Sequence, residues 1–141
     1  MENRFLNVKV HENGSLDIFD KKNSITYKRL GVFEDRADAG DTYNYSEPLN
    51  DKIILSTDEK ASIEWVERGI LFSTLRITIE MKLPGEISKS RNSRAKQTMV
   101  LPIVTYVRLE TGSPVLKFKT FIKNIVKDHR LRVLFPPGFP Q

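Results

Sequence analysis

The sequence predicts an all-β protein built as an antiparallel β-sandwich. Apolar and polar residues alternate with a period of two along several segments, which is typical of strands with one buried and one wet face. Turn dipeptides such as Asn13-Gly14 and Pro84-Gly85 separate these segments. The chain has 141 residues, a length that fits one domain. We therefore expect residues 1–141 to form a single sandwich of about seven to nine strands.

The first elements form a predicted hairpin. Residues 6–10 and 16–18 alternate apolar and polar side chains on either side of Asn13-Gly14. Both turn residues tolerate positive φ, so the two segments are expected to pair. A polar turn at 20–23 and a short third strand at 25–27 follow.

The clearest strand lies at residues 75–83, where every second side chain is apolar, and Pro84-Gly85 ends it. Three later segments alternate in the same way: residues 101–109, 116–122 and 131–135. Pro102 has no N–H to donate, so the strand at 101–109 begins there, bulges there or lies at a sheet edge.

Residues 56–70 fit two periods. STDE at 56–59 resembles a helix capping box, and the apolar residues after it fit helical spacing. However, Ile63 and Trp65 alternate with polar neighbours, and Arg68-Gly69 is typical of a hairpin turn before the next strand. We therefore expect a strand here.

The composition excludes several functional classes. Without cysteine the chain has no disulfides, thiol chemistry or Cys-type zinc site. Two histidines, His11 and His129, are too few for a His-rich metal site. No apolar run approaches the ~18 residues of a membrane span, and the N-terminal residues do not resemble a signal peptide. We expect a soluble, cytoplasmic protein that does not associate with membranes.

The formal charge of +5 hides an asymmetry. Residues 1–70 carry 14 acidic and 10 basic side chains, whereas residues 71–141 carry 4 and 13. Such a split can mark a nucleic-acid or membrane face. Most of the later cations fall on the outward phase of strands, which favours a solvated sheet face. The basic segment 89–96 lacks the interleaved aromatic residues on which bases stack, so we expect a mobile polar loop and no nucleic-acid binding.

One long connection differs from the short turns elsewhere. Residues 30–48 read LGVFEDRADAGDTYNYSEP, in which four acidic residues precede Tyr43 and Tyr45. Carboxylates accept hydrogen bonds from hydroxyl groups, and aromatic rings cover the apolar C–H side of a sugar ring. This combination is typical of a sugar site. The alternative is that the acids cap turns or pair with arginines and that the tyrosines are packed.

Several segments resemble one known family. Residues 33–48, FEDRADAGDTYNYSEP, resemble the signature that opens the sandwich part of bacterial alpha-mannosidases of glycoside hydrolase family 38, which include the mannosylglycerate hydrolases. Residues 2–27 are similar to the family's first hairpin, and KDHRLRVLFPPG at 127–138 is similar to a family strand. The resemblance implies an incomplete supersandwich of the galactose mutarotase type. It also implies a fragment of a larger enzyme, with Phe139–Gln141 departing from the family pattern.

The resemblance implies that the chemistry lies outside this chain. Family members are retaining, zinc-dependent enzymes that hydrolyse terminal alpha-mannosides. Their nucleophile, acid–base aspartate and zinc ligands lie in an N-terminal catalytic part that no segment here matches. We expect no catalytic residue, metal ligand or cofactor in this chain, and no hydrolase activity on its own. The expected partners are the missing catalytic domain, which this domain would buttress, and a mannose-containing carbohydrate.

The resemblance also implies roles for individual residues. Family members place a tyrosine near the bound sugar, for which Tyr43 is the best positional match and Tyr45 the second. Asp38 and Asp41 are expected to contact the sugar, with holding the loop as an equal alternative. The loop-structuring residues are expected to be Glu34, Asp35, Arg36 and Gly40. His129 is expected to be a hydrogen-bonded structural residue.

Two alternatives of a different class stay open. The first is a stand-alone carbohydrate- or protein-binding module, whose open sheet edges would invite self-association. The second is a basic nucleic-acid binder that uses residues 89–96 and the lysine-bearing strand faces.

Overall fold

The fold is given by a computed structural model that describes residues 1–137. Gly138 and the predicted departure from the family pattern at Phe139–Gln141 lie outside the described residues. The strands are β1 (Leu6–Val10), β2 (Leu16–Asp20), β3 (Ile25–Leu30), β4 (Val32–Ala37), β5 (Ile54–Leu55), β6 (Ser62–Arg68), β7 (Phe72–Pro84), β8 (Thr98–Glu110), β9 (Leu116–Ile122) and β10 (His129–Leu134). A single turn of 3-10 helix, Ser56–Asp58, follows β5.

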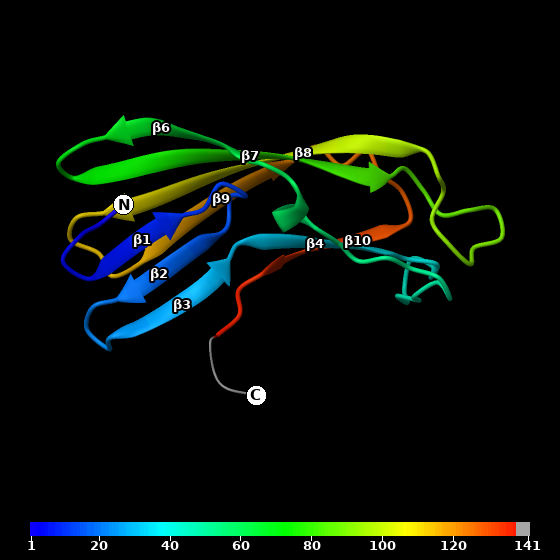
Figure 1. Cartoon of the computed structure of the whole chain (residues 1–141), viewed down its shortest axis with the longest axis horizontal. Helices are drawn as coiled ribbons and strands as arrows, with labels where there is room; N and C mark the ends of the chain where they lie inside the picture. The colour runs from blue at the N-terminus through cyan, green and yellow to red at the C-terminus, as the bar shows by residue number, and fades with distance from the viewer. Residues whose placement is uncertain (138–141) are drawn as a thin grey trace.

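The strands form two facing layers. One layer is the four-stranded sheet β6-β7-β8-β9, and the other contains the three-stranded sheets β1-β2-β3 and β10-β4-β5. The long strands β7 and β8 run along the molecule, with β1–β3 beneath one half and β4 and β10 beneath the other (Figure 1). Every pairing between named strands in the described residues is antiparallel. The predicted fold class, an all-β antiparallel sandwich, is confirmed.

The core lies between these layers and follows the predicted alternation. Leu75, Ile77, Ile79, Met81 and Leu83 of β7 are all buried. Their register places them opposite alternate residues of β8, which are also buried with the exception of Met99 at the strand's start. Each such side chain contributes about 1.5–3 kcal/mol by leaving water. The predicted strands at 75–83 and 101–109 are therefore confirmed, each extended at its ends.

Pro102 lies within β8. Of the three expected explanations, which were a strand start, a bulge and a sheet edge, the structure shows the sheet edge. It is opposite Glu80 of β7 without a shift in register. On the other side, β9 pairs with β8 only from Ile103 onward. The missing N–H therefore falls where β8 has no neighbour on that side.

The segment at 56–70 is resolved in favour of the strand. Residues 62–68 form β6, and the capping-box resemblance at 56–59 corresponds to the single 3-10 turn. Arg68-Gly69 begins the turn into β7, where Gly69 N–H donates to the carbonyl of Phe72 at 2.9 Å.

The prediction of one long connection over residues 30–48 is wrong at its start. Residues 32–37 form β4, the central strand of its small sheet, and five of its six residues are buried. Because β4 has few exposed positions, it lacks the apolar–polar alternation that reveals a half-buried strand. Glu34, Asp35 and Arg36 therefore lie on a strand rather than in a loop.

The sheets have open edges that could pair with a second copy of the chain, and self-association stays a prediction. Within residues 1–137, β6 is exposed along its whole length and has a partner only in β7. No helix in this part of the chain is long and apolar enough to cross a membrane.

We expect Gly14→Ala to lower the free energy of unfolding by about 2–4 kcal/mol. Gly14 has a φ of +83°, and an added Cβ would lie 2.9 Å from side-chain atoms of both Ile77 and Ile79. The matched control is Gly112→Ala, because no atom lies within 4 Å of the Cβ position there. Urea denaturation of both variants measures the difference. Equal losses of stability would contradict the close approach of this hairpin to the sheet.

Candidate functional site

The candidate site is the tyrosine loop, defined as residues 38–47, which follows β4. Two aspartates cap its backbone. Asp38 Oδ1 accepts the N–H groups of Gly40 and Ser46 at 2.8 and 3.1 Å. Asp41 Oδ1 accepts those of Tyr43 and Asn44 at 2.8 and 2.9 Å. These backbone hydrogen bonds lower the pKa of the Asp41 carboxyl. The loop-holding alternative thus has direct geometric support, while sugar contact stays a prediction.

Gly40 is required where the loop closes on itself. A Cβ at this position would lie 1.7 Å from the carbonyl oxygen of Asn44. The N–H of Asp41 donates to that same oxygen at 3.2 Å. No side chain at position 40 fits against the backbone of Asn44 on the facing side of the loop. This close approach is consistent with the loop-structuring role expected of Gly40.

The two tyrosines differ in their surroundings. Tyr43 is 91% exposed, whereas Tyr45 is 38% exposed. The guanidinium carbon of Arg130 in β10 lies 3.6 Å from the centre of the Tyr45 ring. This cation–π contact holds Tyr45 against the sheet, so only Tyr43 projects freely into solvent.

A second segment binds the backbone of the tyrosine loop through hydrogen bonds. Residues 86–95, named the basic arm, fold back on themselves, with hydrogen bonds from Ser88 N–H to Ser93 O at 2.8 Å and from Ala95 N–H to Glu86 O at 3.0 Å. Arg91 of this arm donates from Nη2 to the carbonyls of Ala39 and Gly40 at 2.6 and 3.1 Å. Both arginines of residues 89–96 bind other parts of the chain, while the mobility expected of this segment stays a prediction.

The other arginine of the arm enters a buried ionic cluster. The side chain of Arg94 is 9% exposed and that of Asp35 is fully buried. Arg94 Nη2 donates to Asp35 Oδ1, and Arg94 Nε lies 3.2 Å from Asp51 Oδ1. Asp51 Oδ2 in turn accepts the N–H of Ala37 at 2.9 Å. Charges removed from water in this way need such partners, because an unpaired buried charge is very costly.

His129 completes this cluster from β10. Its Nδ1 lies 2.5 Å from Asp35 Oδ2, and its Nε2 lies 3.0 Å from Asn124 Oδ1. The same Asn124 oxygen accepts the N–H of Val126 at 3.0 Å, which fixes the orientation of the amide. Hydrogen-bond partners therefore lie next to both ring nitrogens, which fixes the orientation of the imidazole. The expected structural, hydrogen-bonded role of His129 agrees with this geometry.

The second acid of β4 is paired with arginines on the other face of the strand. Glu34 Oε1 accepts a hydrogen bond from Arg132 of β10, directly opposite in the register, and one from Arg36 Nε at 2.9 Å. Arg36 also lies 3.7 Å from Glu47. The Arg132 guanidinium holds the pKa of Glu34 below its ordinary value of 4.5. Glu34, Asp35 and Arg36 thus fix the strand from which the tyrosine loop leaves.

Sequence reasoning missed the partners that hold this site together. The missed residues are Asp51, Arg91, Arg94, Asn124, Arg130 and Arg132. Arg94 is separated from Asp35 by 59 positions and His129 by 94. Only the register of β4 with β10, which the sequence does not display, could have paired Glu34 with Arg132.

The residues that meet here do not fit a metal ion. Among residues 1–137, no group of three or more histidine and carboxylate side chains is arranged to hold one. Asp35 and Asp51 both face Arg94, which occupies the position that a cation would need. The zinc expected of the parent enzyme stays a prediction about parts outside this chain.

The same fold occurs as part of larger glycosidases of known structure. An alpha-mannosidase from Enterococcus faecalis V583 superposes on 99% of this chain with a TM-score of 0.95 and 34% identity. A second structure, of a protein in glycosyl hydrolase family 38 from Enterococcus faecalis, superposes on all of it with a TM-score of 0.96 and 34% identity. The chain covers 17% and 19% of those two chains.

Sequence comparison gives the same result. The family model "Glycosyl hydrolases family 38 C-terminal domain" matches residues 1–140. A protein from Halalkalibacterium halodurans, provisionally named a mannosylglycerate hydrolase, is 30% identical over 96% of this chain, which covers 17% of that relative. The chain belongs to the C-terminal domain family of the family 38 glycosyl hydrolases.

We expect Arg94→Met to lower the free energy of unfolding by about 3–5 kcal/mol, because it leaves Asp51 buried without its cation and Asp35 with only His129 beside it. The matched control is Arg91→Met, which removes an exposed arginine from the same arm and should cost less than about 1 kcal/mol. Chemical denaturation at neutral pH measures both. If Arg94→Met fails to fold while Arg91→Met folds normally, the difference still holds. Similar small losses would contradict the buried cluster.

We expect the Glu34 carboxyl to contribute to acid sensitivity. Its pKa is lower in the folded state than in the unfolded state, so its stabilising contribution is present above about pH 4.5 and is lost as the pH falls through the folded-state value. Glu34→Gln should therefore weaken the dependence of stability on pH below about 4.5. Arg132→Met, which removes the main cause of the shift, should do the same. Unfolding curves at a series of pH values test this, and an unchanged slope in both variants would contradict it.

Proposed function

We propose that residues 1–141 form the sandwich domain of a retaining, zinc-dependent alpha-mannosidase that hydrolyses terminal alpha-mannosides. In the intact enzyme this domain buttresses the catalytic domain and presents Tyr43 to the mannose pocket. Membership of the family 38 C-terminal domain family supports the parent activity. The observation that carries the role of the loop is the exposure of Tyr43, 91%, in a loop whose backbone is held by hydrogen bonds from Asp41 and Arg91.

A constrained loop with one exposed aromatic ring suits a sugar. The ring is apolar on its faces, and pyranose rings have an apolar C–H side that packs on such faces. Because Asp41 and Arg91 already hold the loop, binding orders few additional groups, which lowers the entropic cost of binding. Tyr45, held by Arg130, offers a second, less exposed aromatic surface beside it.

Asp38 and Asp41 are able to combine both of their expected roles. Each uses its Oδ1 atom for the two backbone N–H groups of the loop. The Oδ2 atoms are then the ones that accept hydrogen bonds from sugar hydroxyl groups. The caps therefore also orient two carboxylates next to Tyr43.

The catalytic chemistry belongs to the parent enzyme's other domain in this proposal. Zinc there would orient the sugar for that chemistry and would be held by residues outside this chain. The residues of this chain bind and orient the sugar and hold the loop in place. The nucleic-acid alternative loses its main candidates, because Arg91 and Arg94 are bound within the chain.

A domain exchange tests the proposal. The matching segment of the Enterococcus faecalis alpha-mannosidase, at a TM-score of 0.95, is replaced by residues 1–137 of this chain. We expect the exchanged enzyme to hydrolyse 4-nitrophenyl alpha-mannoside and Tyr43→Ala to lower kcat/KM about 3- to 10-fold, as loss of one aromatic contact predicts. The 141-residue chain alone should show no activity, with or without zinc.

The control for this experiment is Tyr27→Ala, which removes a partly exposed tyrosine of β3, far from the tyrosine loop in sequence. It should leave kcat/KM unchanged. An exchanged enzyme that is fully active with Tyr43→Ala would remove the loop from the sugar pocket. Zinc-dependent turnover by the chain alone would overturn the division of labour between the domains.

A further inference from the structure

The outer face of the four-stranded sheet carries a second group of aromatic and basic side chains. Along β7 and β8, alternate residues such as Leu75 and Val107 point into the core, so the residues between them face outward. The outer patch is defined by seven such residues on β7, β8 and β9, which are Thr74, Arg76, Tyr106, Arg108, Lys117, Lys119 and Phe121. It belongs to the layer opposite the one from which the tyrosine loop leaves (Figure 1).

Strand register brings these side chains together in rows. Tyr106 lies between Arg76 on β7 and Lys119 on β9, and Arg108 lies opposite Lys117 in the next row. Phe121 continues the face one row beyond Lys119, opposite Val104. Two aromatic side chains and four cations therefore share this face, which was not evident from the separate segments of sequence.

Two of the aromatic rings, those of Tyr106 and Phe121, pack edge to face and are named the aromatic corner. The rings of Tyr106 and Phe121 are 6.0 Å apart between centroids and nearly perpendicular, at 86°. Phe121 is 50% exposed although it is a large apolar side chain. Beside them lies a hollow of about 390 Å³ that six residues of the patch help to line, all except Arg76. Hollows of this size fit a small molecule such as a single sugar ring.

The charges of the patch are only partly neutralised. Arg76 pairs with Glu64 at 2.6 Å, and Lys117 pairs with Glu110 at 2.8 Å. Arg108 lies 3.4 Å from the same Glu110 carboxylate and stacks on Phe72. Lys119 has no carboxylate partner in the described residues, and its ammonium lies 5.0 Å from the centre of the Phe121 ring. One unneutralised ammonium thus stands beside the aromatic corner.

We propose that this hollow binds a monosaccharide that carries one anionic group. The C–H side of the sugar ring packs on the Phe121 and Tyr106 corner, and the anionic group, a phosphate or a carboxylate, binds the ammonium of Lys119. The glutamates that interrupt the patch, Glu64 and Glu110, disfavour a long polyanion, which would have to pass over both. No residue of the tyrosine loop lines this hollow.

The test is a residue-resolved NMR titration of the 141-residue chain. The probes are mannose 6-phosphate, glucuronate, methyl alpha-mannoside, inorganic phosphate and a 12-nucleotide oligo-dT. We expect saturable shifts of the Lys119 and Phe121 amides with at least one of the two anionic sugars. The neutral sugar and phosphate alone should bind at least about tenfold more weakly, because each offers half of the contacts. Comparing the two anionic sugars shows whether phosphate or carboxylate is preferred.

Single substitutions make the test specific. Lys119→Ala and Phe121→Ala should each weaken binding about fivefold or more, whereas Lys89→Ala in the basic arm should not change it. The proposal is overturned if anionic sugars bind no better than phosphate, or if Lys119→Ala binds as well as the unmodified chain. Tighter binding of oligo-dT with a steep salt dependence would instead make this face a nucleic-acid surface.

Discussion

The burial of Asp35 in β4 is the constraint on which the candidate site depends. Its carboxylate is fully buried, and a charge in that position persists only with close partners. Arg94 and His129 supply them from the basic arm and from β10. This one carboxylate therefore ties three distant segments together at the point where the tyrosine loop begins, and Asp51 extends the cluster to the N–H of Ala37.

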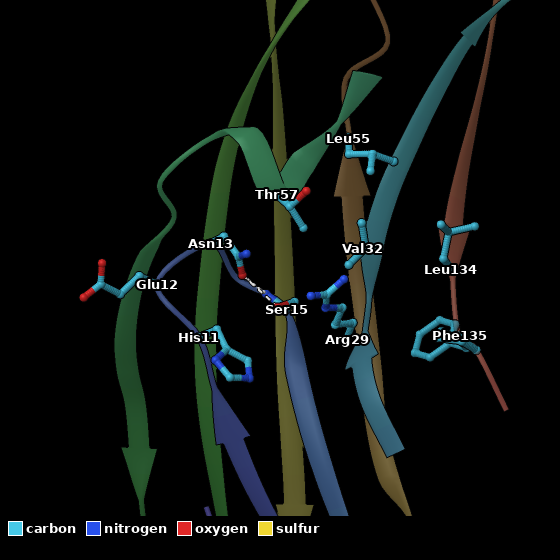
Figure 2. A pocket seen from close by; sticks show the side chains of 11 residues that line it. His11, Glu12, Asn13, Ser15, Arg29, Val32, Leu55, Thr57, Leu134 and Phe135 are labelled. Atoms are coloured by element: carbon cyan, nitrogen blue, oxygen red, sulfur yellow. Dashed lines mark hydrogen bonds between the residues drawn. The ribbon is translucent and has the colours of Figure 1, made fainter. Parts of the chain in front are cut away.

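The chain uses its cations in two different ways. The arginines of the basic arm and of β10 bind carboxylates, carbonyls and the Tyr45 ring within the molecule, so they position the tyrosine loop rather than attract a ligand. On the opposite layer, Lys119 has no carboxylate partner in residues 1–137 and lies beside exposed Phe121. Another hollow, between the β1–β2 turn and the end of β10, is lined by His11, Arg29 and Phe135 among others (Figure 2). Its lining combines charged, polar and apolar side chains, a combination that is not specific to one class of ligand.

Sequence reasoning predicted what depends on local pattern. Alternation revealed residues 75–83 and 101–109 because those strands have one wet face, and Asn13-Gly14 revealed the first hairpin because its turn needs positive φ. The strand β4 was missed because burial on both faces removes the alternation, and its acids looked like loop residues. The resemblance at 33–48 located the tyrosine loop, but no local signal connects Arg94 with Asp35, since that contact exists only in the folded chain.

The most direct test of this account is amide hydrogen exchange in the tyrosine loop. We expect the loop to be ordered before any ligand binds, because the Asp38 and Asp41 carboxylates accept its N–H groups and β4 anchors its base. The amides of Tyr43, Asn44 and Ser46 should therefore exchange at least about tenfold more slowly than in an unstructured peptide. Asp35→Asn should remove that protection while the amides of β7 stay protected. Exchange of the loop amides at the unstructured rate in the unmodified chain would contradict the account.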